Sequence, residues 1–166
     1  IYDATRNATL AGTATAVGLG SDVVSATGTG VGTFDNKNVG TAKPVTVTGY
    51  TLTGTDAGNY TALQPVGVTA DITAKPVTAM GMIASSKVYD GTTTASLSGG
   101  VLVGVIATDA SNVALTQSGA FADKNVGTGK TVTVNNAIAG AEAGNYSLTQ
   151  TSTTLSADIT AKALTV

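Results

Sequence analysis

The chain contains no cysteine, no histidine and no tryptophan, and only 4% of its 166 residues are aromatic. The missing residue types exclude imidazole acid–base catalysis, thiol nucleophiles, disulfides and metal sites built from thiolates or imidazoles. Charged residues make up 11% of the chain, less than half of the share of about 25% that is usual in globular domains. We therefore expect no cofactor, and an enzyme is the weakest of the functional interpretations.

Charge and hydropathy restrict the partners. The net charge is −2 and the eight basic residues are spread singly, so the chain has no basic patch for nucleic acid or anionic lipid. The longest apolar run, Val101 to Ala107, is far shorter than the roughly 20 residues of a membrane-spanning helix. We expect no nucleic-acid partner, no membrane span and a monomer.

The residues that are abundant point to one structural class. Threonine, valine and glycine dominate, while nine of the ten acidic residues are aspartate and good helix formers are scarce. Residues 11–16 alternate between threonine and small residues, which is the period of a strand. The composition predicts an all-β chain with many short strands.

An internal repeat sets the number of domains. The stretch from Phe34 to Val47 recurs in similar form from Phe121 to Val134, offset by 87 positions. A repeat of this length has about the size of a small β-sandwich. We therefore predict two tandem domains of one fold, residues 1–79 and residues 80–166.

The two copies are not identical in length. The first copy has no counterpart of Met80 to Lys87, so one reading is that it lacks its first strand. It also carries one extra residue between Val47 and Tyr60, and Leu52 loses the alternation that Val45 and Val47 share. A β-bulge can accommodate such an extra residue.

A short acidic–Ala-Gly-Asn-Tyr run occurs in each copy and is similar to the tyrosine corner of immunoglobulin-like domains. In such a corner, glycine would supply an unusual backbone angle, and the tyrosine hydroxyl would bond to nearby backbone. The corner residues are Asp56, Gly58, Tyr60, Glu142, Gly144 and Tyr146. The predicted fold is two immunoglobulin-like β-sandwiches. The alternative, a β-grasp-like fold, needs a crossing helix, for which residues 108–115 are the best candidate.

Four motifs in fixed order carry a family resemblance. The opening motif is Tyr2-Asp3 in the first copy and Tyr89-Asp90-Gly91 in the second, followed by the stretch 123–130, the corner run and the closing segment 157–166. Together they resemble the YDG repeats, which occur in tandem in large bacterial surface proteins of the filamentous-haemagglutinin type. The resemblance implies export, display on the bacterial surface, and a role in adhesion or biofilm formation.

Several residues are possible sites. Asp109 and Asn112 are weak candidates for calcium, although aspartate and asparagine are also the usual turn residues. The four lysines around the central loops could in principle form a Lys–Asn cross-link, but their place among turn residues predicts that they are solvated. They are Lys37, Lys43, Lys124 and Lys130. We assign no metal and no catalytic residue.

The functional prediction is a structural stalk or spacer repeat whose partners are neighbouring repeats of the same chain. The alternative is a ligand-binding adhesin module that recognises a glycan or a host surface protein through loops at the sandwich ends. Such a site would be expected where the copies differ, in residues 18–32 and 105–119.

Overall fold

The computed structural model describes all 166 residues and divides into two compact units, Ile1–Thr73 and Ala74–Val166. The boundary lies earlier than the predicted one between residues 79 and 80. The reason is that β7 (Lys75–Ala84) is a single strand of the second unit, where it pairs with β10 (Leu97–Val103) and β13 (Tyr146–Leu148). The end of the first repeat in sequence is thus the start of the second unit in space.

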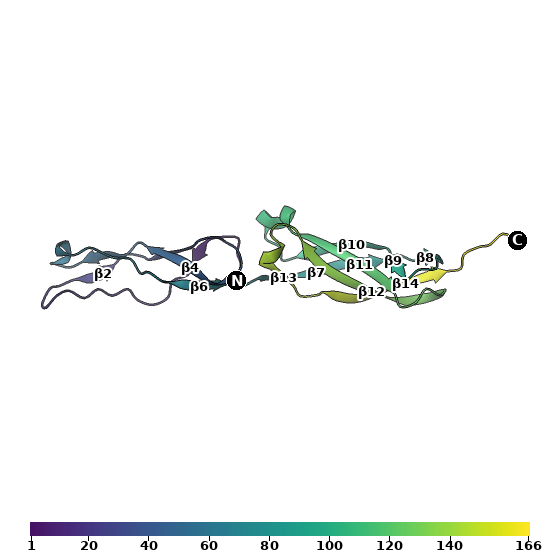
Figure 1. The fold of residues 1–166 in the computed structure, drawn as a ribbon, viewed down its shortest axis with the longest axis horizontal. Helices are drawn as coiled ribbons and strands as arrows, with labels where there is room; N and C mark the ends of the chain where they lie inside the picture. The colour runs from purple at the N-terminus through teal and green to yellow at the C-terminus, as the bar shows by residue number, and fades with distance from the viewer. The chain divides into compact units, whose positions relative to one another are not determined.

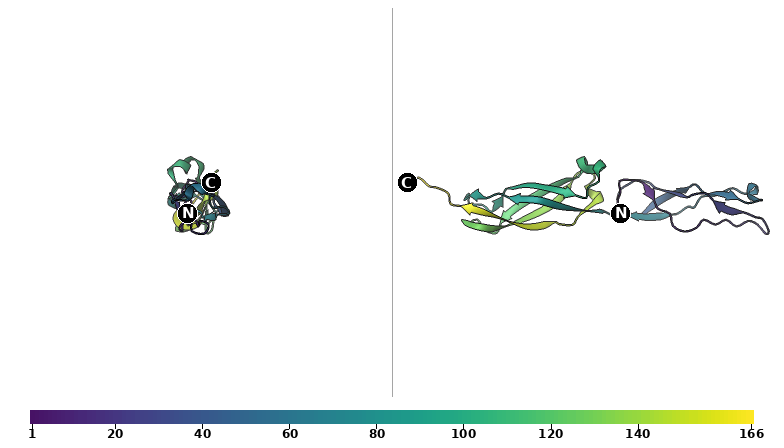
Figure 2. Two further views of the ribbon diagram at one scale, coloured as in Figure 1. Left: turned by 90° about the vertical axis from the view of Figure 1, so that its left-hand side faces the viewer. Right: turned by 180° about the vertical axis from the view of Figure 1, so that it is seen from behind.

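The second unit consists of two sheets (Figure 1). One has three strands in the order β10-β7-β13, with β13 parallel to β7. The other has five strands, which are β8 (Lys87–Val88), β14 (Ser152–Thr160), β12 (Gly127–Ala139), β11 (Ala114–Phe121) and β9 (Thr94–Ala95). The last strand of the sheet, β14, ends at Thr160. Residues 161–166 follow β14 as an extended, unpaired segment (Figure 2).

The core of the second unit lies between these sheets. Valine and threonine alternate along β12, which puts Val132 and Val134 at 0% exposure and leaves the threonines exposed. Met82 and Ala84 of β7 pack against this cluster from the three-stranded sheet. The unit is therefore a two-layer β-structure.

The all-β prediction is confirmed. The helical segments are short 3-10 turns, η1 (Ala57–Asn59), η2 (Ala107–Asn112) and η3 (Ala143–Asn145). The crossing helix of the β-grasp alternative is absent, since its candidate segment forms η2 and the start of β11. The immunoglobulin-like assignment stays a prediction. No helix is long and apolar enough to cross a membrane.

The first unit repeats only part of this plan. Its four-stranded sheet contains β1 (Asn7–Ala8), β3 (Val31–Phe34), β4 (Gly40–Thr48) and β6 (Thr69–Ile72), and a separate ladder joins β2 (Ser25–Thr27) to β5 (Thr51–Thr53). It has no three-stranded sheet. Its buried apolar side chains are Tyr2, Phe34, Val45, Val47 and Ile72.

The extra residue of the first copy interrupts a hairpin. In the second unit, β11 and β12 pair without a break from Ala114 to Phe121. In the first unit, the matching strands separate where Gly28 and Gly49 both adopt positive φ angles of 88° and 95°. A whole break, and not a single bulge, absorbs the change of alternation at Leu52.

Candidate functional sites

The corner tyrosines make the same two hydrogen bonds in both units. The Tyr146 hydroxyl donates to Asp109 Oδ2 at 2.7 Å and accepts from the Ile106 N–H at 3.2 Å. The Tyr60 hydroxyl donates to Asp22 Oδ2 at 2.7 Å and accepts from the Leu19 N–H at 2.9 Å. The expected bond to backbone is present, and an aspartate that the sequence comparison did not assign to the corner completes it.

This arrangement gives Asp109 a structural role. Its carboxylate is 2% exposed and accepts the Tyr146 hydroxyl, while Asn112 contributes its backbone carbonyl to the Glu142 N–H. The two calcium candidates therefore hold the corner closed. The structure has no group of three or more His, Cys, Asp or Glu side chains placed to hold a metal ion.

The glycine expectation for the corner is wrong. Gly58 and Gly144 lie inside η1 and η3, and neither has a positive φ angle. The backbone freedom of glycine is used four positions earlier, at Gly54 and Gly140, where φ is 123° and 119°. A Cβ atom at either position would collide with a backbone carbonyl, that of Val23 in the first unit. The glycine that the turn requires therefore precedes the motif.

The acidic residue of the corner differs between the units. The Asp56 carboxylate accepts the Val23 N–H at 2.8 Å, whereas the Glu142 carboxylate accepts the Asn145 side-chain amide at 2.7 Å. The backbone N–H groups of both acids donate to equivalent carbonyls across the corner. The substitution of aspartate by glutamate thus keeps the backbone bond and redirects the side chain.

The opening motif is a turn closed by its aspartate. Asp3 Oδ1 accepts both the backbone N–H and the hydroxyl of Thr5, and Asp90 Oδ1 accepts the same pair from Thr92. The tyrosines of the motif bond to the backbone near the end of each unit, since the Tyr2 N–H donates to the Thr73 carbonyl and the Tyr89 N–H to the Thr160 carbonyl. The motif is therefore bonded to the end of the last strand of its unit, β6 in the first unit and β14 in the second.

Lys87, which the sequence comparison did not single out, adds to this turn in the second unit. Its Nζ lies 2.9 Å from Asp90 Oδ1, donates to the Thr92 and Thr94 carbonyls, and sits 5.5 Å from the centre of the Phe121 ring. Only 17% of its side chain is exposed. The lysine joins the turn to the core cluster.

The residue after the aspartate adopts a left-handed conformation in both units, with φ of 65° at Ala4 and 81° at Gly91. An alanine there is strained by roughly 1–2 kcal/mol, and a Cβ at Gly91 would meet open space. We expect Gly91→Ala to lower the free energy of unfolding of the second unit by about 1 kcal/mol, and Ala4→Gly to raise that of the first by somewhat less. Urea unfolding with hydrogen exchange for each unit tests this. Equal signs for the two changes would contradict it.

A second feature shared by the two units is a lysine that bonds across the loop between two paired strands, residues 35–39 in the first unit and 122–126 in the second. We call this arrangement the lysine clamp. Lys43 Nζ lies 2.9 Å from Asp35 Oδ1 and donates to Asn36 Oδ1 at 2.8 Å, and Lys130 Nζ lies 2.7 Å from Asp123 Oδ1. The two lysine side chains are only 10% and 13% exposed. The expectation of solvated lysines is wrong for Lys43 and Lys130, whose side chains are largely covered while the ammonium group closes the loop. It holds for Lys124, which is exposed, and Lys37 is half-buried.

The clamp places a lysine, an asparagine and an acid together, yet its electrostatics favour an ion pair. The Lys43 ammonium, and then the Asn36 N–H, lower the pKa of the half-exposed Asp35 carboxyl. Lys130 does the same to the pKa of Asp123. A cross-link would need a buried acid, and a half-exposed carboxylate held ionised is the opposite condition.

Just before the clamp lysine, the strand register shifts at a β-bulge, and an aspartate of the neighbouring strand bonds to the backbone of this bulge. The Ala42 N–H donates to Asp71 Oδ1 at 2.7 Å, and the Gly129 N–H donates to Asp158 Oδ1 at the same distance. Both donors have positive φ angles and lie where the strand register shifts. Asp71 and Asp158 are therefore repeated structural residues.

The hydrogen bond from Lys87 to Asp90 should make the stability of the second unit depend on pH in the acidic range. The Lys87 ammonium, with the N–H and hydroxyl of Thr92, lowers the pKa of Asp90 to about 2. Because this pKa lies below the unfolded value of about 3.9, the contribution is complete above about pH 4 and is lost as the pH falls toward about 2. We expect the second unit to lose stability in this window, measured by urea unfolding. Asp90→Asn should flatten the slope, and an unchanged slope would contradict the assignment.

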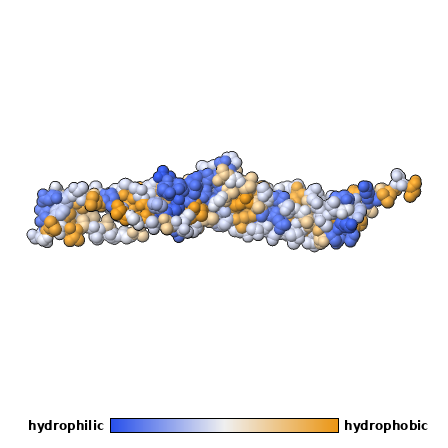
Figure 3. Space-filling view, in the orientation of Figure 1, coloured by the Kyte–Doolittle hydropathy of each residue, from blue (hydrophilic) through white to orange (hydrophobic).

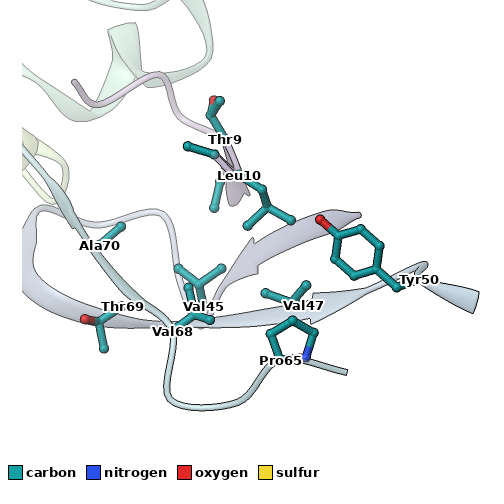
Figure 4. A pocket seen from close by; sticks show the side chains of 11 residues that line it. Thr9, Leu10, Val45, Val47, Tyr50, Pro65, Val68, Thr69 and Ala70 are labelled. Carbon is teal, nitrogen blue, oxygen red and sulfur yellow. The ribbon is translucent and has the colours of Figure 1, made fainter. Parts of the chain in front are cut away.

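An apolar groove opens in the first unit. It has a volume of about 270 Å³, and Leu10, Val45, Val47, Val68 and Tyr50 are among its lining residues. Figure 4 shows Leu10 facing Val45 and Val47 across it. Tyr50, the one aromatic residue without a counterpart in the second copy, also lines two adjoining grooves.

Taken together, the two units form one kind of domain repeated in tandem, with matching corners, turns and clamps. A family model described as the YDG domain matches residues 1–68 and again residues 73–154. The chain therefore belongs to the YDG domain family. No curated protein and no solved structure matches it.

Proposed function

We propose that this chain is a structural stalk or spacer repeat of a large bacterial surface adhesin, of the filamentous-haemagglutinin type. It acts outside the cell, where it supports adhesion or biofilm formation by holding other parts of the protein away from the surface. Its partners are the neighbouring repeats of the same chain. The proposed location and the proposed role in adhesion rest on the resemblance to the YDG repeats.

One observation supports the proposal most directly. The bonds that recur in both units are internal to each unit: tyrosine to aspartate at the corner, lysine to aspartate at the loop, and aspartate to backbone at the bulge. These bonds fix loops and strand ends of the unit itself. A repeat whose shared residues serve its own architecture fits a scaffold.

A ligand-binding module is the second candidate, and the difference between the copies favours it. Residues 18–32 of the first unit contain a turn and the separate strands β2 and β3, whereas residues 105–119 of the second contain η2 and part of β11. Two grooves of the first unit include residues of this region in their lining. A glycan or a host surface protein would be the partner.

A binding experiment separates the two proposals. The purified chain is applied to a glycan array and to host cells, with a Tyr50→Ala variant as the matched probe of the grooves. The spacer proposal expects no saturable binding in either assay. Saturable binding that free sugar competes away, and that Tyr50→Ala weakens, would replace it with the binding module.

A further inference from the structure

The first and last strands of the second unit run side by side in the same direction. β7 pairs in parallel with β13, and β8, which follows β7, pairs in parallel with β14. These two ladders lie at opposite ends of the unit, where Figure 1 labels β13 and β8. Bonded side chains are 71 positions apart at the first ladder and 72 at the second, so residues 75–89 follow residues 146–160 through the unit. We call this pairing the parallel seam.

The parallel direction is confined to the seam. Every other pair of neighbouring strands in the second unit is antiparallel. Residues 75–89 carry the chain from the first unit into the second, and residues 146–160 lead to the end of its last strand. A pull along the chain therefore acts first on the bonds that join these two segments.

Backbone and side-chain groups both close the first end of the seam. The Val77 carbonyl accepts the Thr149 N–H at 2.9 Å and the Thr149 hydroxyl at 3.2 Å. The hydroxyls of Thr78 and Thr149 lie 2.9 Å apart. Val77 and Tyr146, one from each segment, are 1% and 5% exposed. This end of the seam is therefore anchored in the core.

Different groups close the second end. The Asp158 N–H donates to Ser86 Oγ at 2.9 Å, and the Tyr89 N–H donates to the Thr160 carbonyl at 2.8 Å. Hydrophilic side chains gather at this end of the second unit (Figure 3). Ile159, between the two bonds, is 1% exposed and belongs to the core cluster. The seam is therefore bonded at both of its ends.

We propose that the parallel seam is a force-bearing element that keeps the second unit folded when the chain is pulled along its length. Such a pull draws residues 75–89 and residues 146–160 in opposite directions, so the paired strands must slide past one another. The bonds of a parallel ladder are evenly spaced along the strands, so sliding stretches them together. In an antiparallel pair that is pulled open from one end, the bonds break one after another. This inference rests on the proposed spacer function, in which the repeat transmits tension.

The direction of pulling tests the proposal by single-molecule force measurement on the whole chain. Because the chain has no cysteine, one introduced cysteine takes the second handle, with the first at the N-terminus. Ala161→Cys pulls along the seam, whereas Ala107→Cys pulls β7 and β10 apart from the end where Thr78 lies opposite Val103. Both alanines are exposed. We expect the second unit to open at a several-fold higher force with Ala161→Cys. The length of chain released identifies the unit that opens.

A matched pair of exposed threonines tests the bonds themselves. Thr149→Val removes a hydroxyl that bonds across the seam, and Thr116→Val removes one that bonds to the Ala137 carbonyl across the antiparallel pair β11 and β12, each at 3.2 Å. At constant force along the seam, Thr149→Val should shorten the lifetime of the folded second unit about fivefold, the effect of one hydrogen bond that is broken in the transition state. Thr116→Val should leave this lifetime nearly unchanged.

Two results would overturn the proposal. One is opening of the second unit at equal forces for the two handle positions, since the parallel pairs would then resist no more than an antiparallel pair. The other is an equal change of lifetime in Thr149→Val and Thr116→Val, since the seam would then not be what holds the unit under force. Either result would leave the spacer function to the binding assays, because a spacer without a force-bearing seam still binds no glycan and no host cell.

Discussion

Replacing Tyr146 by alanine is expected to lower the free energy of unfolding of the second unit by about 3–5 kcal/mol, the range found for large buried aromatic residues. The ring is 5% exposed, and its hydroxyl joins Asp109 to the Ile106 N–H. Removal of the ring opens a cavity and takes a hydrogen-bond donor from a carboxylate that is 2% exposed. Both losses act on the same corner.

Phenylalanine at this position separates the two contributions. Tyr146→Phe keeps the packing and removes only the hydroxyl, so we expect a loss of about 1–3 kcal/mol, the cost of an unsatisfied buried polar group. Urea unfolding of the chain, followed for each unit by hydrogen exchange, gives these values.

The first unit supplies the matched control. Tyr60 makes the same two bonds, but its ring is only half-buried and Asp22 is exposed, so water can replace the lost hydroxyl. Tyr60→Phe should therefore cost clearly less than Tyr146→Phe. Equal effects, or no effect of either change, would show that the tyrosine corner is not what stabilises this turn.

The tyrosine corner shows what a single sequence can predict. The recurrence of an aromatic residue with a polar tip in one motif identified Tyr60 and Tyr146, because local chemistry and repetition point to the same residues. The aspartates that complete the corner lie 37 and 38 positions away. Their role depends on which loop the fold brings beside the ring, and a local motif carries no such information.

The lysine clamp shows how local sequence can mislead about the exposure of a side chain. Turn residues around Lys43 and Lys130 suggested exposure, since asparagine, glycine and aspartate are typical of solvated loops. In the structure, the lysine stems are covered while their charges reach an aspartate seven or eight positions earlier. Long side chains bury their stems and keep their charge at the surface, so the exposure of the loop does not settle that of the lysine.

The domain boundary was missed for a related reason. A tandem repeat in a sequence can be divided into units that begin at any position of the repeat. The closing motif suggested that the first unit ends at Ala79. Strand pairing decides where the unit begins, because β7 is hydrogen-bonded to β10 and β13 of the following repeat. Only long-range contacts reveal that the end of one repeat folds with the next.

A charge placed in β7 tests this boundary. Val77 is 1% exposed in the second unit, and its carbonyl accepts the N–H of Thr149. Val77→Asp would bury a carboxylate without a charged partner, which we expect to cost about 3–5 kcal/mol of the stability of the second unit. Because the total stability of a small domain is about 5–15 kcal/mol, this change removes a large share of the stability of the unit.

Met80→Asp is the control, because Met80 lies on the same strand and is 52% exposed. It should change stability little. Hydrogen exchange distinguishes the units: Val77→Asp should speed exchange of the amides of β12 and β14, while β3 and β4 of the first unit keep their protection. If the first unit lost protection and the second kept it, β7 would belong with the preceding repeat and the boundary would move back beyond Ala79. The position of one buried valine thus decides how the repeats of this chain divide.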